Sequence, residues 1–175
     1  MSAVMSGAVN VQMFLAHALT LENEAAERYE DLADVLETHN NAEVATLFRD
    51  LARFSRMHAA EVREKAAPYG ELPHIAPWDF VWNRQEAPEA AAFEEAHYMM
   101  KPYHALTMAL AAEESSNRYY ASVAAETRDP EVARLAREFA DEEGEHAELV
   151  RKWLAKVPVP DKNWDDDPDP PVMVE

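Results

Sequence analysis

The stretch Phe139-Ala-Asp-Glu-Glu-Gly-Glu-His-Ala-Glu-Leu-Val150 combines helix-forming residues with two ionisable side chains on its apolar side. Phe139, Leu149 and Val150 recur at helical spacing, which predicts one buried stripe. Glu143 and His146 fall within that stripe, three residues apart and therefore on one face of a helix. A buried carboxylate destabilises a fold by several kcal/mol unless it is paired or binds a metal. The stretch therefore predicts a helix that carries a Glu-x-x-His pair into a protein core.

The sequence around this stretch predicts three further long helices. The chain of 175 residues has only three Gly, and its Pro residues cluster within residues 68–102 and 158–171. Ala, Glu, Leu and Arg, all strong helix formers, dominate the remainder, whereas Pro ends helices. We predict helices over residues 11–37, 42–67, 102–127 and 130–157, with Asp129-Pro130 as the cap and first turn of the last one.

The connections between these helices predict an all-α, antiparallel four-helix bundle. Short turns near residues 38–41 and at 128–129 join the helices into two hairpins. Residues 68–101 separate the hairpins and are numerous enough to cross a helix about 37 Å long. We expect Trp78-Asp-Phe-Val-Trp82 to pack on the outside and residues 89–100 to form a short helix. One bundle over residues 1–160 is then followed by an acidic, Pro-rich tail, 161–175, that is disordered or loosely docked.

The composition excludes several classes of function. Lys and Arg number 16 against 34 Asp and Glu, a net charge of −18, which argues against nucleic acids and anionic membrane surfaces as partners. The absence of Cys excludes disulfides, thiolate catalysis and Cys-ligated metal sites within this chain. No apolar run approaches the roughly 20 residues of a membrane span. Without a basic, apolar leader at the N-terminus, we expect a cytoplasmic protein.

The two predicted hairpins resemble each other, which indicates a degenerate two-fold repeat. The matching segments are residues 43–47 and 131–135, 29–33 and 120–124, and 58–62 and 146–150. The repeat pairs Tyr29 with Tyr120 and His58 with His146.

Three more ionisable residues interrupt apolar stripes in the same way as Glu143 and His146. Glu22 lies in the stripe of the first helix, His58 in that of the second and Glu113 in that of the third. Taken singly, such a residue is explained by partial exposure at a stripe edge or by a hydrogen bond in the core. Their heights along the helices favour a shared site, because the residues of each hairpin lie at similar distances from its turn. We therefore expect all five side chains to meet at one level of the bundle.

Three carboxylates and two imidazoles in a bundle interior predict a metal site. Mixed oxygen and nitrogen ligands suit iron, with manganese as the alternative. One Glu from each of two helices and a Glu-x-x-His motif from each of the other two form the di-iron carboxylate pattern.

At these residues the sequence resembles the rubrerythrin family of the ferritin-like superfamily, over residues 12–67 and 102–157. The resemblance lies in residues 139–150 and in Leu21-Glu-Asn-Glu-Ala-Ala-Glu-Arg-Tyr29. It implies a di-iron centre that oxidises Fe(II) and reduces peroxide or dioxygen, in a homo-oligomer that is most simply a homodimer. The positions that match metal ligands of the family are Glu22, His58, Glu113, Glu143 and His146. The resemblance assigns no catalytic residue beyond these five positions.

The sequence departs from the family pattern at position 55. A second Glu-x-x-His would place Glu there, but the chain has Ser55-Arg-Met-His58. Glu61, one turn beyond His58, either compensates or is an ordinary surface residue, and we favour the surface position. Glu114 is a weaker candidate because it lies one residue off its stripe. The site is then asymmetric, binds one metal well, or is degraded.

A second departure is the missing rubredoxin-like domain, whose four Cys bind iron and deliver electrons in many rubrerythrins. Redox turnover in this chain therefore needs an external electron donor. Two other functions stay open: a non-enzymatic bundle that binds a partner and has lost its metal site, and iron binding or storage without turnover.

Overall fold

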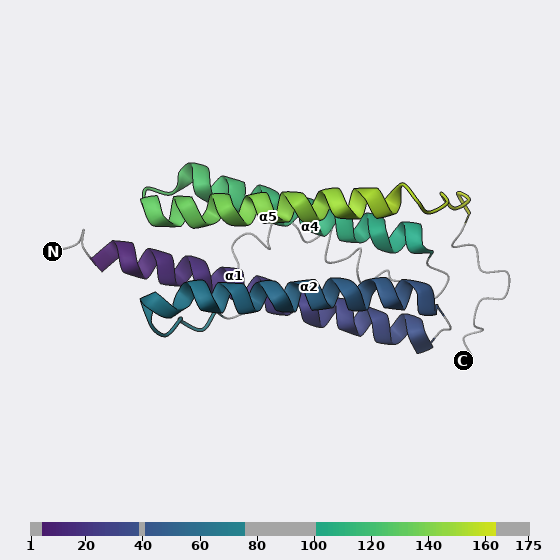
Figure 1. Ribbon diagram of the computed structural model, residues 1–175, viewed down its shortest axis with the longest axis horizontal. Helices are drawn as coiled ribbons and strands as arrows, with labels where there is room; N and C mark the ends of the chain where they lie inside the picture. Colours follow the sequence, from purple (N-terminus) through teal and green to yellow (C-terminus); the bar gives the residue numbers. More distant parts are fainter. Residues whose placement is uncertain (1–4, 39–40, 76–100, 164–175) are drawn as a thin grey trace, which may run out of the picture.

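The computed structural model describes residues 5–38, 41–75 and 101–163, and these residues form a helical bundle without strands (Figure 1). Helix α1 spans Met5–Thr38 and α2 spans Ala42–Ala66, followed by a 3₁₀ turn, η1, at Ala67–Tyr69. Helices α4 and α5 span Pro102–Glu126 and Pro130–Leu154. Trp78–Trp82, the predicted helix at 89–100 and tail residues 164–175 lie outside the described ranges.

The four predicted long helices are confirmed, and their ends follow from local chemistry. The Asp129 carboxylate accepts hydrogen bonds from the backbone N–H groups of Glu131 and Val132, at 2.9 and 3.2 Å, and so caps α5. Pro130 occupies the first turn of that helix, where its missing N–H has no partner to lose. After η1, Gly70 has φ = 87°, a left-handed conformation that glycine adopts without strain.

The start of α1 differs from the prediction, because the helix begins at Met5 rather than near residue 11. Val11, Phe14 and Leu15 are buried against other helices and fix the first predicted turn in place. Once such a turn exists, adding each preceding residue gains a backbone hydrogen bond at little further entropic cost.

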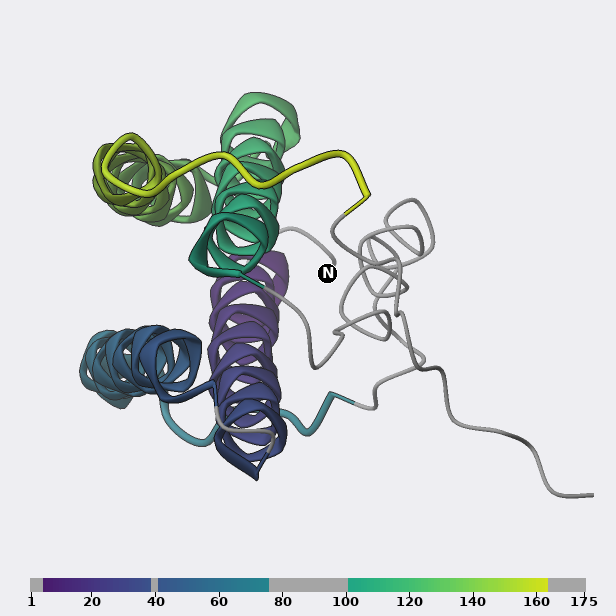
Figure 2. The same ribbon diagram turned by 90° about the vertical axis from the view of Figure 1, so that its right-hand side faces the viewer.

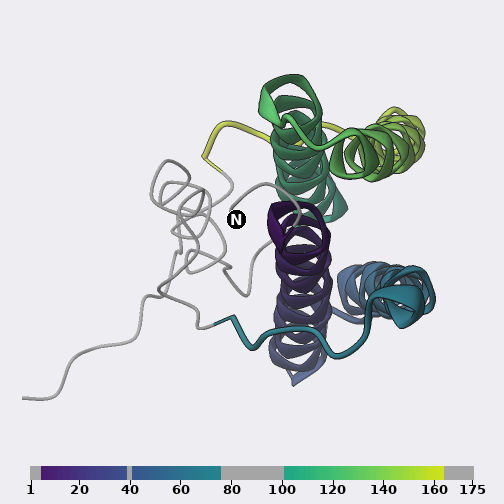
Figure 3. The ribbon, with the colours of Figure 1, turned by 90° about the vertical axis from the view of Figure 1, so that its left-hand side faces the viewer.

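The helices are arranged as two antiparallel hairpins that lie side by side. Helix α1 packs along α2, and α4 packs along α5, while fewer contacts join the hairpins. Seen along the bundle axis, α1 and α4 form one layer and α2 and α5 form the other (Figures 2 and 3). This is the ferritin-like arrangement that the connection lengths predict. None of the described helices combines the length and apolar character needed to cross a membrane.

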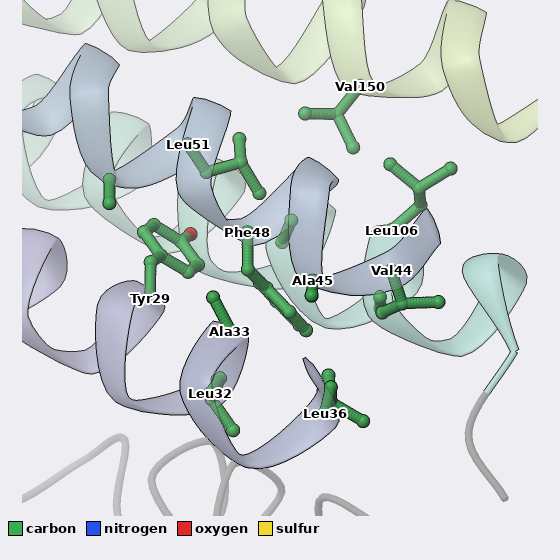
Figure 4. Packing of buried hydrophobic residues seen from close by; sticks show 13 residues of the cluster. Tyr29, Leu32, Ala33, Leu36, Val44, Ala45, Phe48, Leu51, Leu106 and Val150 are labelled. Carbon is green, nitrogen blue, oxygen red and sulfur yellow. The ribbon is translucent and has the colours of Figure 1, made fainter. Parts of the chain in front are cut away.

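The interior consists of two apolar clusters, each built from both hairpins. The first cluster contains Tyr29, Leu36, Phe48 and Leu106, and it lies toward the turn between α1 and α2 (Figure 4). The second is built around Phe14, Leu15, Leu135 and Phe139 near the opposite end. Between them, the residues whose burial is described include four buried polar ones, Glu22, Ser55, Ser115 and Glu143. The two clusters hold the hairpins together on either side of this polar layer.

Candidate metal centre

A cavity of about 50 Å³ lies in the polar layer and receives side chains from all four long helices. Its ionisable and hydroxyl-bearing lining residues are Glu22, Tyr29, Ser55, His58, Glu113, Ser116, Glu143 and His146. The structure thus brings together the five side chains that interrupt the apolar stripes. Their convergence was predicted from stripe position and height, whereas a role in metal binding stays a prediction.

Helices α1 and α2 contribute one carboxylate–imidazole pair to the cavity. The Nδ1 atom of His58 lies 3.7 Å from Oε1 of Glu22, and the side chains are 16% and 7% exposed. Both residues lie one or two turns from the first apolar cluster, so the packing that buries the cluster also directs them inward. We call this pair the α1–α2 half of the site.

Helices α4 and α5 contribute two carboxylates around a single imidazole. The Nδ1 atom of His146 lies 3.5 Å from Oε2 of Glu113 and 3.7 Å from Oε2 of Glu143. The glutamate side chains are 14% and 7% exposed. Since Glu143 and His146 are three residues apart on α5, they share one helix face. We call this group the α4–α5 half of the site.

The two halves meet through their histidines. The rings of His58 and His146 stack with centroids 4.4 Å apart and an interplanar angle of 22°. His58, Glu143 and His146 each place one ligand atom so that these atoms lie within 4.8 Å of one another. Glu143 therefore lies against the imidazoles of both halves.

Burial and the crowding of carboxylates shift the pKa values of several groups. Burial raises the pKa of Glu113 to about 7; the negative charge of Glu143 adds to this rise and His146 opposes it. Burial by itself would lower the pKa of His146, but Glu113 and Glu143 outweigh it and raise that pKa to about 10. For His58, burial is likewise outweighed by Glu22, so its pKa is also raised. The site thus favours positive charge at its centre, which is what a cation provides.

Two tyrosines lie on opposite sides of the polar layer. Tyr29 packs on Phe48 in the first cluster and lines the cavity, and Tyr120 packs against Phe14 and Phe139 in the second cluster. Burial, followed by nearby carboxylates, raises the pKa of both phenols well above the ordinary value. The two phenols therefore stay protonated, and that of Tyr29 lines the larger cavity.

A second, smaller cavity of about 10 Å³ adjoins the α1–α2 half of the site. It shares Glu22, His58 and Glu143 with the larger cavity, and Glu61 and Glu142 also line it. Glu61 is exposed and Glu142 is half-buried. Sequence analysis named Glu61 as a weaker candidate but missed Glu142. Glu142 directly precedes Glu143 in the sequence, and this position could have identified it as a candidate. The nearness of Glu142 to Glu61, however, depends on how α5 packs against α2.

The remaining predicted positions lie as follows. Glu114 lines neither cavity; it points outward, 38% exposed, and forms an ion pair with Arg151 at 2.6 Å. Ser55 is buried, 7% exposed, and lines the larger cavity one turn before His58. Ser55 therefore occupies, relative to His58, the position that Glu143 occupies relative to His146.

The donor set fits a cation that prefers oxygen and nitrogen ligands. Three carboxylates and two imidazoles face the larger cavity, which suits iron or manganese. The set is short for two equivalent ions, because two carboxylates lie within 3.7 Å of His146 Nδ1 and only Glu22 lies that close to His58 Nδ1. The residues thus fit a metal centre with two unequal halves.

The helical bundle and its buried His/Glu group define a protein of the ferritin-like class. The sequence profile of the Rubrerythrin family matches residues 13–76 and 104–166, so the chain belongs to this family. The chain is also similar to an uncharacterized conserved protein from Magnetospirillum magnetotacticum MS-1, whose crystal structure has been determined at 2.00 Å resolution. The two are 47% identical, with a TM-score of 0.67, over 86% of this chain and 97% of that one. No curated protein matches.

Proposed function

We propose that the protein binds iron in its polar layer and couples Fe(II) oxidation to the reduction of peroxide or dioxygen. The observation that carries the proposal is the convergence of five ionisable side chains from four helices on one buried cavity. Membership of the Rubrerythrin family supports the same chemistry. Manganese is the alternative metal, since the donor types suit both.

In this proposal the ligands are the five lining residues Glu22, His58, Glu113, Glu143 and His146. When bound, the metal supplies a Lewis acid and a source of electrons for cleaving an O–O bond. The chain's own groups then bind and orient the small oxidant inside a cavity that lies between the two apolar clusters. The buried phenol of Tyr29 supplies a hydrogen-bond donor beside Glu113 and Glu143.

Electrons reach the site from a separate donor in this proposal. The 175 residues contain no Cys, so this chain cannot hold the Cys-ligated iron that serves this purpose in many rubrerythrins. We further propose a cytoplasmic homodimer, and one bundle domain over residues 1–160 with the acidic tail 161–175 outside it. These proposals rest on the family resemblance and on the composition.

The experiment that tests this function measures metal and its oxidation together. Protein purified without chelators is analysed for metal, loaded with Fe(II) under anaerobic conditions and then mixed with one equivalent of peroxide. We expect iron in the purified protein and rapid formation of a protein-bound Fe(III) absorption band. The test variant is Glu113→Ala. Its matched control is Glu114→Ala, which changes the neighbouring surface residue. Equal bands from both variants, or no uptake of Fe(II) by the wild type, would contradict the proposal.

A second candidate function is a binding bundle without redox turnover, and the buried Ser55 favours it. A neutral hydroxyl in place of a carboxylate is what a degraded metal site would show, and the remaining groups can pair with one another. Glu22 with His58, and Glu113 with His146, already lie 3.7 and 3.5 Å apart. Failure to bind Fe(II) would support this alternative.

A further inference from the structure

We propose that the two halves of the site hold metal unequally: the α4–α5 half retains its ion, and the α1–α2 half exchanges its ion with solution. This inference rests on the proposed function, because it assumes that the site binds metal. It adds which part of the site is a permanent cofactor position and which part receives substrate cations such as Fe(II).

The first argument is the number of donors in each half. His146 has two carboxylates around its Nδ1 atom, at 3.5 and 3.7 Å, whereas His58 has only Glu22, at 3.7 Å. Ser55 stands where a second carboxylate would complete the α1–α2 half. Because carboxylate oxygens are the preferred ligands of hard divalent cations and carry the compensating charge, the half whose imidazole has two of them close by binds more tightly.

The second argument is the relation of the two imidazoles. Paired metal ions in proteins lie about 3.5–4 Å apart. The rings of His58 and His146 stack nearly parallel, with centroids 4.4 Å apart, a spacing close to that of a metal pair, so each ring can bind an ion of its own. Glu143 reaches both imidazoles and is the carboxylate that the two halves share. Each half then has one carboxylate and one imidazole of its own, and the shared Glu143 lies within ion-pair distance, 3.7 Å, of His146 and not of His58.

The third argument is access. The small second cavity is lined by Glu22, His58 and Glu143 but not by Glu113 or His146, so it contacts both residues of the α1–α2 half and only one of the α4–α5 half. Glu61, which is exposed, and Glu142 face the same cavity. Carboxylates beside an opening raise the local concentration of cations and speed their arrival. The half with fewer ligands is thus also the half beside this cavity, which extends to the exposed Glu61 and which we call the acidic opening.

The equilibrium test uses Mn(II), which stays in one oxidation state during the measurement. Protein stripped with chelator is titrated with Mn(II) by calorimetry, and free Mn(II) is followed by its electron paramagnetic resonance signal. We expect two binding events whose Kd values differ by at least about tenfold, or 1.4 kcal/mol. Ser55→Glu should tighten the weaker event by about tenfold or more and leave the tighter one nearly unchanged. Ser55→Gln, which matches it in size but lacks the charge, should not.

Two further variants test the unequal binding of metal if Ser55→Glu does not fold. Glu22→Gln should abolish the weak event and spare the tight one, whereas Glu113→Gln should abolish the tight event. Wild-type Kd values within about twofold of each other, or equal effects of these two variants on the tight event, would overturn the inference. That result leaves the proposed function standing; only a protein that binds neither Mn(II) nor Fe(II) removes both.

The kinetic test addresses the opening. The double variant Glu61→Gln/Glu142→Gln should slow the loading of the weaker position several-fold in stopped-flow mixing with Mn(II). The control is Glu64→Gln/Glu145→Gln, which removes the same charge from two exposed residues on α2 and α5 outside both cavities. Equal loading rates in the two double variants would contradict the role of the acidic opening.

Discussion

The two hairpins share an apolar framework but differ in the polar groups that they place inside it. Leu51 and Phe139 occupy equivalent positions of the repeat and are both buried, seven residues before His58 and His146 respectively. Three residues before the same histidines, the first hairpin buries a serine and the second buries Glu143. The comparison shows that the framework and the ligand set can vary independently, because packing requires volume and apolarity whereas binding a cation requires charge.

The largest effects are expected where the framework is truncated, and they should be similar in the two hairpins. Leu36→Ala in α1 and Leu135→Ala in α5 each remove a buried side chain that lines neither cavity. Each should lower the free energy of unfolding by about 2–5 kcal/mol, because the lost contacts leave a void. Denaturant unfolding in chelator measures this. A loss of less than about 1 kcal/mol in only one hairpin would show that the two frameworks are not equivalent.

The next largest effect concerns metal and should separate the hairpins. A ligand that binds only the folded state stabilises it by about 2.7 kcal/mol at a hundredfold excess over Kd. Wild-type protein should therefore melt at a higher temperature with Mn(II) than with chelator. Glu113→Ala should lose most of this gain, and Glu22→Ala should lose less of it.

The matched control for this prediction is Glu114→Ala, which removes only a surface ion pair with Arg151. It should keep the full response to metal. In chelator, Glu113→Ala should change stability little or increase it, because a poorly solvated carboxyl group has been removed. Identical metal responses of Glu113→Ala and Glu114→Ala would rule out Glu113 as a ligand.

A smaller effect is expected from pH in the absence of metal. The pKa of His146 rises from 6.5 to about 10 on folding, so the stability it contributes is complete below 6.5 and is lost as pH rises toward 10. Burial raises the pKa of Glu113 from 4.5 to about 7, so this group also destabilises the fold as pH increases. The folded state holds more protons than the unfolded state, and stability then falls with pH.

Melting in chelator should therefore occur on the order of 5 °C lower at about pH 9 than at about pH 6. The groups that face His146 from the packed helices are Glu22, His58, Glu113 and Glu143. His146→Gln should reduce the difference. Excess Mn(II) should oppose it, because protons compete with the metal for the same ligands. A melting temperature that rises over this range in chelator would contradict the prediction.

The smallest effect tests the turn of the second hairpin. Asp129→Ala removes the side chain that caps α5 through two backbone N–H groups. It should lower stability by about 1 kcal/mol, or roughly 3 °C in melting temperature. Asp129→Asn should be nearly neutral, since asparagine caps helices about as well. A loss as large with Asn as with Ala would mean that the charge, rather than the capping bond, is what matters.

Periodicity made much of the fold predictable from the sequence. Stripes at helical spacing, Asp129-Pro130 and the Pro-rich crossover indicate the four helices and their pairing, because these signals act through local backbone geometry. The inward positions of Glu22 and Glu113 follow from the same stripes. Their arrival at one level follows from helix rise and short turns, which leave little freedom in how each hairpin aligns.

The other features of the site depended on contacts between elements that are distant in the sequence. Glu142 joins Glu61 in the small cavity only because of how α5 packs against α2. Glu114 faces outward by its position on the helix, but its ion pair with Arg151, a residue 37 positions away, depends on how α4 packs against α5. The stacking of His58 on His146 requires the two hairpins to dock in one register, which the apolar clusters at both ends determine. No pattern within a single helix contains this information.

The internal repeat has a consequence for symmetry. If each hairpin were a separate, identical subunit, a two-fold axis would impose the same residue on both sides of the site, and a change at one position would occur twice. Joining the hairpins in one chain removes that constraint, so a single codon can alter one side alone. Ser55 opposite Glu143 is such a change. Covalent linkage thus lets a symmetric scaffold carry two positions with different tasks, which no symmetric dimer of hairpins can do.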